Sequence, residues 1–80
     1  MCYVYLLICA DGTLYCGATK NIEKRLKRHR SGKGAKYVAS RLPVEVFYVE
    51  ESKDWATALR REYAIKQMSR QKKLGLVVMK

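Results

Sequence analysis

Five side chains in this sequence have the chemistry to act together on a phosphate group: Tyr5, Tyr15, Arg25, His29 and Glu62. Arg25 carries the forked donor that suits phosphate oxygens, and His29 titrates near neutral pH and can pass a proton. Glu62 is a lone carboxylate, which can be enough for magnesium, because this ion commonly takes one or two protein carboxylates and keeps several waters. The elements that hold these residues decide whether they can meet.

Two strand patterns near the start of the chain must present both tyrosines. Residues 3–9 are rich in aromatic and aliphatic side chains, and residues 13–17 follow as the return strand of a β-hairpin around Asp11 and Gly12. A two-residue loop would set the apolar face of the first strand beside the wrong face of the second. We therefore predict a three-residue loop with a left-handed Gly12, since a one-residue slip would turn every side chain over.

This register brings the two tyrosines together. It sets Tyr5 opposite Gly17 and Leu7 opposite Tyr15, so that the phenol rings become diagonal neighbours on one face of the sheet. Gly17 has no side chain and leaves a niche beside Tyr5. The two hydroxyls could then act on one substrate atom.

A helix predicted over residues 22–30 positions the cation and the imidazole. Ile22 and Leu26 mark its buried stripe by their i, i+4 spacing, and Arg25 and His29 repeat that spacing along the edge of the stripe. This pair predicts a phosphate clamp beside a proton-transfer group. The alternative is an ordinary boundary Arg whose stem packs on the core, with a His that caps the helix end.

The remaining elements complete an α+β fold, in which helices flank a small three-stranded antiparallel sheet in the order β-β-α-β-α-α. One domain over residues 1–80 holds them all. Besides the hairpin and the first helix, which Asn21 caps, we predict a helical turn near residues 35–39, a strand over 44–51, a helix over 55–68 that Ser52 or Asp54 caps, and a short helix from Ser69 to Leu74 that Gly75 stops.

The long helix carries a polar residue where the periodicity favours apolar ones. Glu62 falls inside the expected apolar stripe, which is Trp55, Ala58, Leu59, Ile65 and Met68. A carboxylate there should not be buried unpaired. Glu62 is therefore either a ligand for a divalent cation or a salt-bridge partner of Arg25, Arg61 or Lys66.

Length and charge restrict the classes of protein. The chain has 80 residues, which leaves no room for a two-domain enzyme or a dinucleotide-binding doubly wound fold. Its hydrophobic content of 49% excludes a disordered basic tail. The formal net charge is +10, and residues 19–42 hold nine Lys or Arg against Glu23 alone, so we expect a polyanionic partner, most often nucleic acid.

The sequence predicts a cytoplasmic protein with no membrane partner. No apolar run is long enough to span a membrane, and the chain starts on a strand pattern without a signal peptide. Cys2, Cys9 and Cys16 are then free thiols in a reducing compartment. Their seven-residue spacing matches no CxxC pattern, and the register puts Cys9 and Cys16 on opposite faces, which disfavours a zinc site with His29.

These residues and their spacing resemble the GIY-YIG nuclease superfamily over essentially the whole chain. The tripeptides Tyr3–Tyr5 and Tyr15–Gly17 are similar to the two that name the superfamily, with Tyr3 and Gly17 as scaffold positions. The segment from Arg28 to Lys36 is similar to that of small stand-alone members. The spacing makes the match specific, because the tripeptides are followed in order by Arg25, His29 and Glu62.

The resemblance implies metal-dependent hydrolysis of a DNA phosphodiester, with one Mg²⁺ or Mn²⁺ held by Glu62. The metal would polarise the scissile phosphate, Arg25 would stabilise charge on the phosphoryl group, and His29 would assist proton movement. Tyr15 or Tyr5 would act as base toward the attacking water or position it. An unperturbed phenol has a pKa of about 10, so the base needs help from the nearby cation and metal.

The candidates for contacts with the substrate backbone are basic residues on and around the first helix: Lys20, Lys24, Lys27, Arg28, Lys33 and Lys36. We expect weak intrinsic sequence specificity, or a protein partner that directs cleavage, and RNA is the alternative substrate to DNA. The alternative function is a nucleic-acid-binding module on the same scaffold with little or no turnover. The five chemistry-bearing residues favour the nuclease, because a pure binder needs no Glu62 near phosphate.

Overall fold

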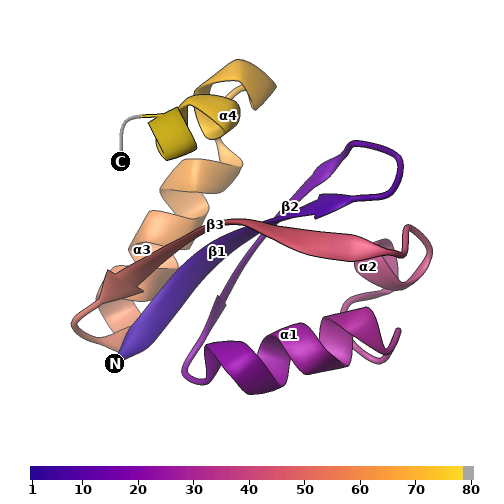
Figure 1. Cartoon of the computed structure of the whole chain (residues 1–80). Coiled ribbons are helices and arrows are strands. Elements are labelled where there is room, and N and C mark those ends of the chain that lie inside the picture. Colours follow the sequence, from indigo (N-terminus) through magenta and orange to yellow (C-terminus); the bar gives the residue numbers. More distant parts are fainter. Residues whose placement is uncertain (79–80) are drawn as a thin grey trace.

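A computed structural model describes residues 1–78 and shows a three-stranded antiparallel sheet with helices on both faces (Figure 1). The strand order is β2-β1-β3, so β1 lies in the centre. Along the chain the elements are β1 (Cys2–Cys9), β2 (Leu14–Thr19), α1 (Ile22–Arg30), α2 (Lys36–Ala39), β3 (Val44–Ser52), α3 (Trp55–Lys66) and α4 (Arg70–Val78). The predicted α+β class and element order are confirmed. Within the described residues no helix is long and apolar enough to cross a membrane.

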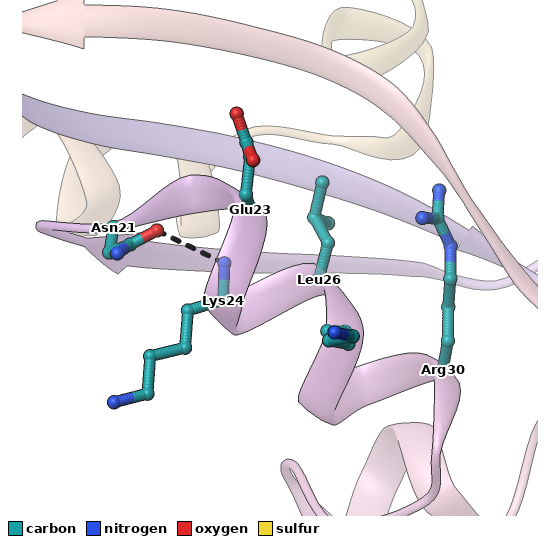
Figure 2. A pocket seen from close by; sticks show the side chains of 6 residues that line it. Asn21, Glu23, Lys24, Leu26 and Arg30 are labelled. Atoms are coloured by element: carbon teal, nitrogen blue, oxygen red, sulfur yellow. Dashed lines mark hydrogen bonds between the residues drawn. The ribbon is translucent and has the colours of Figure 1, made fainter.

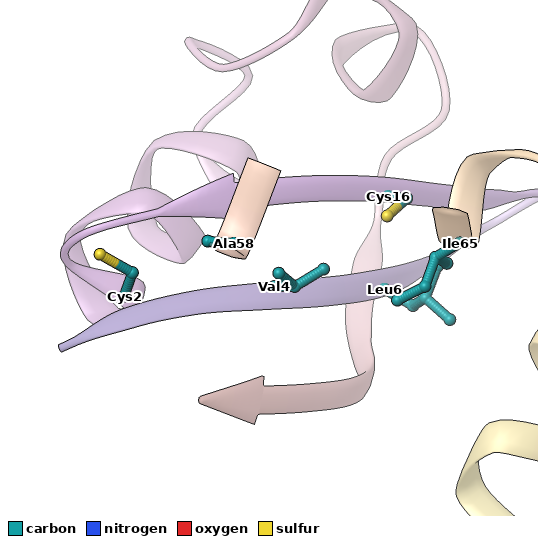
Figure 3. Packing of buried hydrophobic residues seen from close by; sticks show 6 residues of the cluster. All are labelled: Cys2, Val4, Leu6, Cys16, Ala58 and Ile65. Atoms are coloured by element: carbon teal, nitrogen blue, oxygen red, sulfur yellow. The ribbon is translucent and has the colours of Figure 1, made fainter. Parts of the chain in front are cut away.

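The central strand β1 is buried on both faces. On one face Val4 and Leu6 pack with Ile65 in a cluster beneath α3 (Figure 3). On the other face Tyr5 and Leu7 belong to a second cluster, which α1 and α2 cover. All four of these β1 side chains are fully buried. The molecule therefore has three layers, with the sheet between two sets of helices.

The hairpin has the predicted three-residue connection. The Cys9 N–H donates to the Thr13 carbonyl over 2.9 Å, and Gly12 has a φ of 84°, in the left-handed region. Tyr5 therefore lies opposite Gly17. The register that sets the two tyrosines on one face is confirmed.

Side-chain caps start the helices α1 and α3. The Asn21 side chain accepts the Lys24 N–H over 3.0 Å, and the Asp54 carboxylate accepts the Thr57 N–H over 2.7 Å. Of the two caps considered for α3, Asp54 and not Ser52 is used. The bounds of α1 are those predicted, α2 lies within the predicted helical turn, and β3 is one residue longer than predicted.

Two predicted helix ends are wrong. The helix α3 stops at Lys66, two residues before Met68, and the next helix starts at Arg70. The helix α4 then continues through Gly75, which was expected to stop it. Gly75 does not have the positive φ of a helix-ending glycine. A glycine inside a helix costs about 1 kcal/mol relative to alanine, and the packing of Leu76 against the cluster beneath α3 opposes this cost.

The apolar stripe predicted for α3 is wrong at two positions. Ala58 and Ile65 are fully buried as expected, but Trp55 and Leu59 keep 37% and 42% of their surface exposed. Ala58 and Ile65 lie two helical turns apart, so both are on the side of α3 that meets the sheet. At about 100° per residue, Trp55 and Leu59 are rotated from that side by roughly 70° and 110°. They line the flank of α3 instead of its buried face.

The close approach of Gly17 to Tyr5 predicts a cost for any larger residue at position 17. A Cβ there would overlap the hydroxyl and the ring of Tyr5. We expect Gly17→Ala to lower the free energy of unfolding by about 1–3 kcal/mol, measured by denaturant titration. Gly75→Ala is the matched control, because nothing lies within 4 Å of a Cβ there, and it should raise stability by about 0.5–1 kcal/mol. Similar small effects at both positions would contradict the tight packing of Tyr5.

Candidate active site

The hydroxyl of Tyr5 is the meeting point of β1 and α1. Tyr5 Oη lies 2.8 Å from His29 Nε2, and Arg25 Nε donates a hydrogen bond to the same oxygen over 3.3 Å. Tyr5 and His29 are fully buried, and Arg25 is half-buried. The two residues predicted on the edge of α1 thus converge on one of the predicted tyrosines. His29 does not cap the helix end, which was the alternative.

Two glycines make room for this cluster. Gly17 lies opposite Tyr5 on β2, and a Cβ at Gly34 would lie 2.5 Å from His29 Nδ1. Gly34 was not predicted, although a glycine in the basic loop just after His29 was a usable signal for close backbone approach. Tyr3, the other predicted scaffold position, is a half-buried residue of β1 two positions before Tyr5.

Burial sets the protonation states of the cluster. Burial lowers the pKa of His29 and the charge on Arg25 lowers it further, so the imidazole is neutral at pH 7. Burial raises the pKa of Tyr5, although the hydrogen bond and charge of Arg25 oppose this, so the phenol keeps its proton. The hydrogen bond to Tyr5 raises the pKa of Arg25, which keeps the guanidinium charged.

With these charges, the hydrogen bonds can run in one direction. Arg25 Nε–H donates to Tyr5 Oη, and the Tyr5 O–H can donate in turn to Nε2 of the neutral His29. This leaves the imidazole proton on Nδ1, a buried atom with no hydrogen-bond partner among the described residues. A charged imidazole would carry a proton on both ring nitrogens and would remove the acceptor for Tyr5.

Tyr15 lies on the outer side of the cluster. Its ring meets His29 edge-on, with ring centres 5.4 Å apart, and it is half-buried where Tyr5 is fully buried. Tyr37 of α2 stacks on Tyr15 at 6.0 Å, and the guanidinium of Arg41 lies 3.9 Å from the centre of the Tyr37 ring. Tyr37 was not predicted, because α2 is a single short turn whose periodicity cannot reveal which side faces the hairpin.

Glu62 lies on the other side of β2. Its helix α3 covers the opposite sheet face, and its backbone carbonyl accepts from the Cys16 thiol over 3.8 Å. The carboxylate is 20% exposed and pairs with Lys66 over 3.3 Å, one of the predicted salt bridges. Burial, and then the charge of Glu62, raise the pKa of Cys16 to about 11. Burial is the main reason why the pKa of Tyr5 is raised, and the charge of Glu62 adds to it. Glu62 therefore acts on a residue that faces the other side of the sheet.

Glu62 is the carboxylate on which a metal site would depend. Within residues 1–78 no three His, Cys, Asp or Glu side chains gather into an all-protein metal cage. A single half-buried carboxylate fits an ion such as Mg²⁺ or Mn²⁺, which takes most of its ligands from water and substrate oxygens. Cys16 offers no competing thiolate, because its raised pKa keeps it protonated, and Cys9 lies on the other sheet face as predicted.

Some of the predicted backbone-contact residues line an open groove on α1. Lys24 and Lys27 border this groove together with Arg30, which was not predicted, and the groove has a volume of about 590 Å³ (Figure 2). Figure 2 shows Glu23, Leu26 and Arg30 projecting from one side of α1, whereas Lys24 points away from them. Tyr5, Arg25 and His29 do not line this groove, so it is separate from the cluster around the Tyr5 hydroxyl.

The other predicted contact residues are spread over neighbouring elements. Lys20 follows β2, and its ammonium lies 5.4 Å from the centre of the Trp55 ring. Arg28 donates to the Lys33 carbonyl over 3.2 Å, which ties the loop after α1 to that helix. Lys36 is the first residue of α2.

Comparisons with known proteins show the family of this chain. A family model described as the GIY-YIG catalytic domain matches residues 1–74. The UPF0213 protein SSP2268 of Staphylococcus saprophyticus is 51% identical over 75 residues, which cover 94% of this chain and 92% of that protein. A UPF0213 protein of Syntrophus aciditrophicus is 54% identical over 76 residues, covering 94% of this chain and 87% of that protein.

The fold has a solved counterpart. The solution structure of the UPF0213 protein BH0048 from Bacillus halodurans matches with a TM-score of 0.64 at 43% identity, covering 100% of this chain and 86% of that chain. Fold and sequence thus define a GIY-YIG catalytic domain, a class that indicates nuclease-type function. The chain belongs to the GIY-YIG family, and its relatives named above are small UPF0213 proteins. The predicted family resemblance is confirmed.

The neutral, buried His29 predicts a loss of stability in acid. Its pKa in the folded chain lies below the ordinary value of about 6.5, so below that pH the unfolded chain binds a proton that the folded chain excludes. We expect the free energy of unfolding to fall by up to about 1.4 kcal/mol per pH unit from about pH 6.5 down to the folded-state pKa. Denaturant unfolding at a series of pH values measures this slope.

The chain contains 1 histidine, so replacing His29 removes all histidine titration from the experiment. His29→Gln keeps a hydrogen-bonding side chain that cannot titrate, so its stability should change little over the same pH range. If His29→Gln lost as much stability in acid as the unmodified protein, another group would be responsible and the assignment to His29 would be wrong.

Proposed function

We propose that this protein is a divalent-metal-dependent endonuclease that hydrolyses DNA phosphodiester bonds with weak intrinsic sequence specificity. The observation that carries the proposal is the hydrogen-bonded chain from Arg25 through Tyr5 to His29. The His29 ring contacts Tyr15, and the charge of Glu62 contributes to the raised pKa of Tyr5. The residues proposed to bind phosphate, to handle protons and to hold the metal thus lie on the two sides of β2. Membership of the GIY-YIG family supports the same reaction class.

Arg25 is the proposed phosphate-binding residue. Its Nε is fixed by the hydrogen bond to Tyr5, which orients the terminal nitrogens that form bidentate contacts with phosphate. A cation oriented in advance stabilises the charge that builds on the phosphoryl oxygens in the transition state. Tyr5 is then a positioning residue, because its buried hydroxyl holds both Arg25 and His29 in place.

Tyr15 is the proposed base, or the group that positions the attacking water. It has exposed surface, whereas Tyr5 is 0% exposed and its pKa is raised by burial. A phenol without access to solvent cannot take a proton from water unless the fold opens. The rings of His29 and Tyr37 hold Tyr15 from two sides, which favours a single orientation of its hydroxyl.

Glu62 would hold the metal ion, with water and phosphate oxygens as the remaining ligands. When bound, the ion would supply Lewis-acid stabilisation of the phosphate and of the leaving oxygen. Lys66 pairs with the carboxylate and neutralises part of its charge in the free protein. Lys66 therefore keeps Glu62 oriented along α3 and would compete with a cation for it.

We further propose that the strand backbone is held by the six cations predicted from the sequence, which are Lys20, Lys24, Lys27, Arg28, Lys33 and Lys36. They lie just after β2, on α1, in the loop that follows α1 and at the start of α2, close in sequence to Arg25. Phosphate contacts give affinity but carry no sequence information. Selection of a sequence would therefore have to come from a partner protein.

Replacement of Glu62 tests the nuclease proposal. We expect Glu62→Gln to lower magnesium-dependent DNA cleavage at least about 100-fold, because it removes the ligand charge while keeping the side-chain shape. Labelled single-stranded, duplex and branched DNA, incubated with magnesium, manganese or a chelator, provide the measurement. Glu51→Gln is the matched control, because Glu51 is an exposed carboxylate on β3, and it should retain full activity.

Two outcomes would contradict the proposal. Equal cleavage by Glu62→Gln and the unmodified protein would indicate a contaminating nuclease and remove the site assignment. Salt-sensitive DNA binding without metal-dependent cleavage of any substrate would instead support the nucleic-acid-binding module.

Separate replacement of the two tyrosines tests their roles. We expect Tyr15→Phe to lower cleavage about 100-fold or more while the free energy of unfolding changes by less than about 0.5 kcal/mol. Tyr5→Phe should lower stability by about 1–3 kcal/mol, because buried polar atoms of Arg25 and His29 lose their shared partner. Full activity in Tyr15→Phe, with an inactive but stable Tyr5→Phe, would assign the base to Tyr5.

A further inference from the structure

Three large side chains of α3 stay exposed along one flank of the helix. Trp55, Leu59 and Tyr63 keep 37%, 42% and 68% of their surface. Their i, i+4, i+8 spacing aligns them in one stripe, which we call the α3 ridge. Exposed apolar side chains that lie together on a surface commonly mark a binding site.

The α3 ridge borders the proposed catalytic site. Glu62 lies on the same flank of α3, next to Tyr63 in the sequence, and its carbonyl contacts Cys16 of β2. At the other end of the ridge, the Lys20 ammonium lies over the Trp55 ring. The ridge and the cluster around Tyr5 therefore flank the same edge strand, β2.

The charges around the ridge favour an anionic occupant. Lys20 lies at one end, and the exposed Arg60 and Lys66 belong to the same helix, against the acids Glu62 and the capping Asp54. The whole chain carries a net charge of +10, which opposes association with a second copy of this chain, and the charges named at the ridge do not reverse this. An occupant with both negative charge and flat apolar surfaces suits this face, and a nucleotide strand has both.

We propose that the α3 ridge binds the exposed bases of an unpaired nucleic-acid strand, beside the phosphate that the proposed site would cleave. Aromatic side chains stack on base faces whatever the sequence, whereas in a duplex those faces are covered and the grooves present polar edges. Trp55 and Tyr63 are about 12 Å apart along α3, the length of roughly three or four stacked bases. The inference rests on the proposed function and names its substrate class as strands with unpaired bases.

Fluorescence of Trp55 provides a direct test, because the chain contains 1 tryptophan. The protein is titrated at constant salt, in a chelator that prevents cleavage, with a short oligonucleotide that cannot self-pair and with the duplex it forms with its complement. We expect the single strand to quench Trp55 emission. Tyr63→Ala should weaken single-strand binding about tenfold and duplex binding less than about twofold.

Matched variants keep the test interpretable. Val46→Ala removes an apolar side chain with 37% exposure from β3, away from the ridge, and should change neither affinity. Leu59→Ser is a second ridge variant, to be used with circular dichroism so that misfolding of one variant does not decide the result. Absence of quenching by the single strand, or equal losses for single strand and duplex, would overturn the proposal. A doubled molar mass that only the ridge variants abolish would assign the ridge to a second copy and would also overturn it.

Failure of this inference can be told apart from failure of the proposed function, because binding is read without turnover. Quenching and ridge-dependent binding without any metal-dependent cleavage would leave the ridge in place and overturn the nuclease. Cleavage that depends on Glu62, together with ridge variants that bind single strands normally, would overturn the ridge alone.

Discussion

The arrangement of this protein depends on one buried atom, the hydroxyl oxygen of Tyr5. A phenol oxygen with no access to water must find partners inside the protein, and it finds Arg25 and His29 on α1. That requirement fixes how close α1 lies to β1 and how it is rotated about its axis. It also restricts positions 17 and 34 to glycine, because a Cβ at Gly17 would overlap the phenol and one at Gly34 would overlap the imidazole. The same contacts around Tyr5 therefore determine both how the core packs and where the polar groups lie.

The edge strand β2 holds residues of the proposed site on both of its faces. Side chains alternate along a strand, so Tyr15 and Gly17 face α1 while Cys16 between them faces α3. A single strand thus separates Tyr15 and the cluster around Tyr5 from the carboxylate of Glu62. Because β2 is at the edge of the sheet, groups from both faces can reach a substrate that lies along that edge, which a central strand would not allow. The influence of Glu62 on the pKa of Tyr5 is consistent with this short separation.

Sequence patterns predicted the structure wherever one local rule decides the outcome. The left-handed glycine at Gly12 set the hairpin register, and helical spacing set the side of α1 that meets the tyrosines. Sequence patterns did not predict burial where more than one set of side chains has the spacing of a buried helix face. Trp55 and Leu59 fit the apolar stripe of α3 as well as the residues that are buried, and only contact with the sheet selects between them. The full burial of His29 depends on close approach of the chain at Gly34, which helix spacing does not encode.

The exposure of the α3 ridge follows from the ion pair of Glu62 and Lys66 on the same flank of the helix. Because Trp55 and Leu59 stay at the surface, the folded state loses the stabilisation that their burial would give, about 25 cal/mol per Å² of apolar surface. This loss matters in a protein with a small core. A rotation of α3 that buried both would point Lys66 at the sheet, since Lys66 lies between them around the helix. The ammonium and its partner Glu62 would then be taken from water together, at a larger cost. A carboxylate at the β2 edge and an apolar ridge at the surface are thus two results of one rotation of α3.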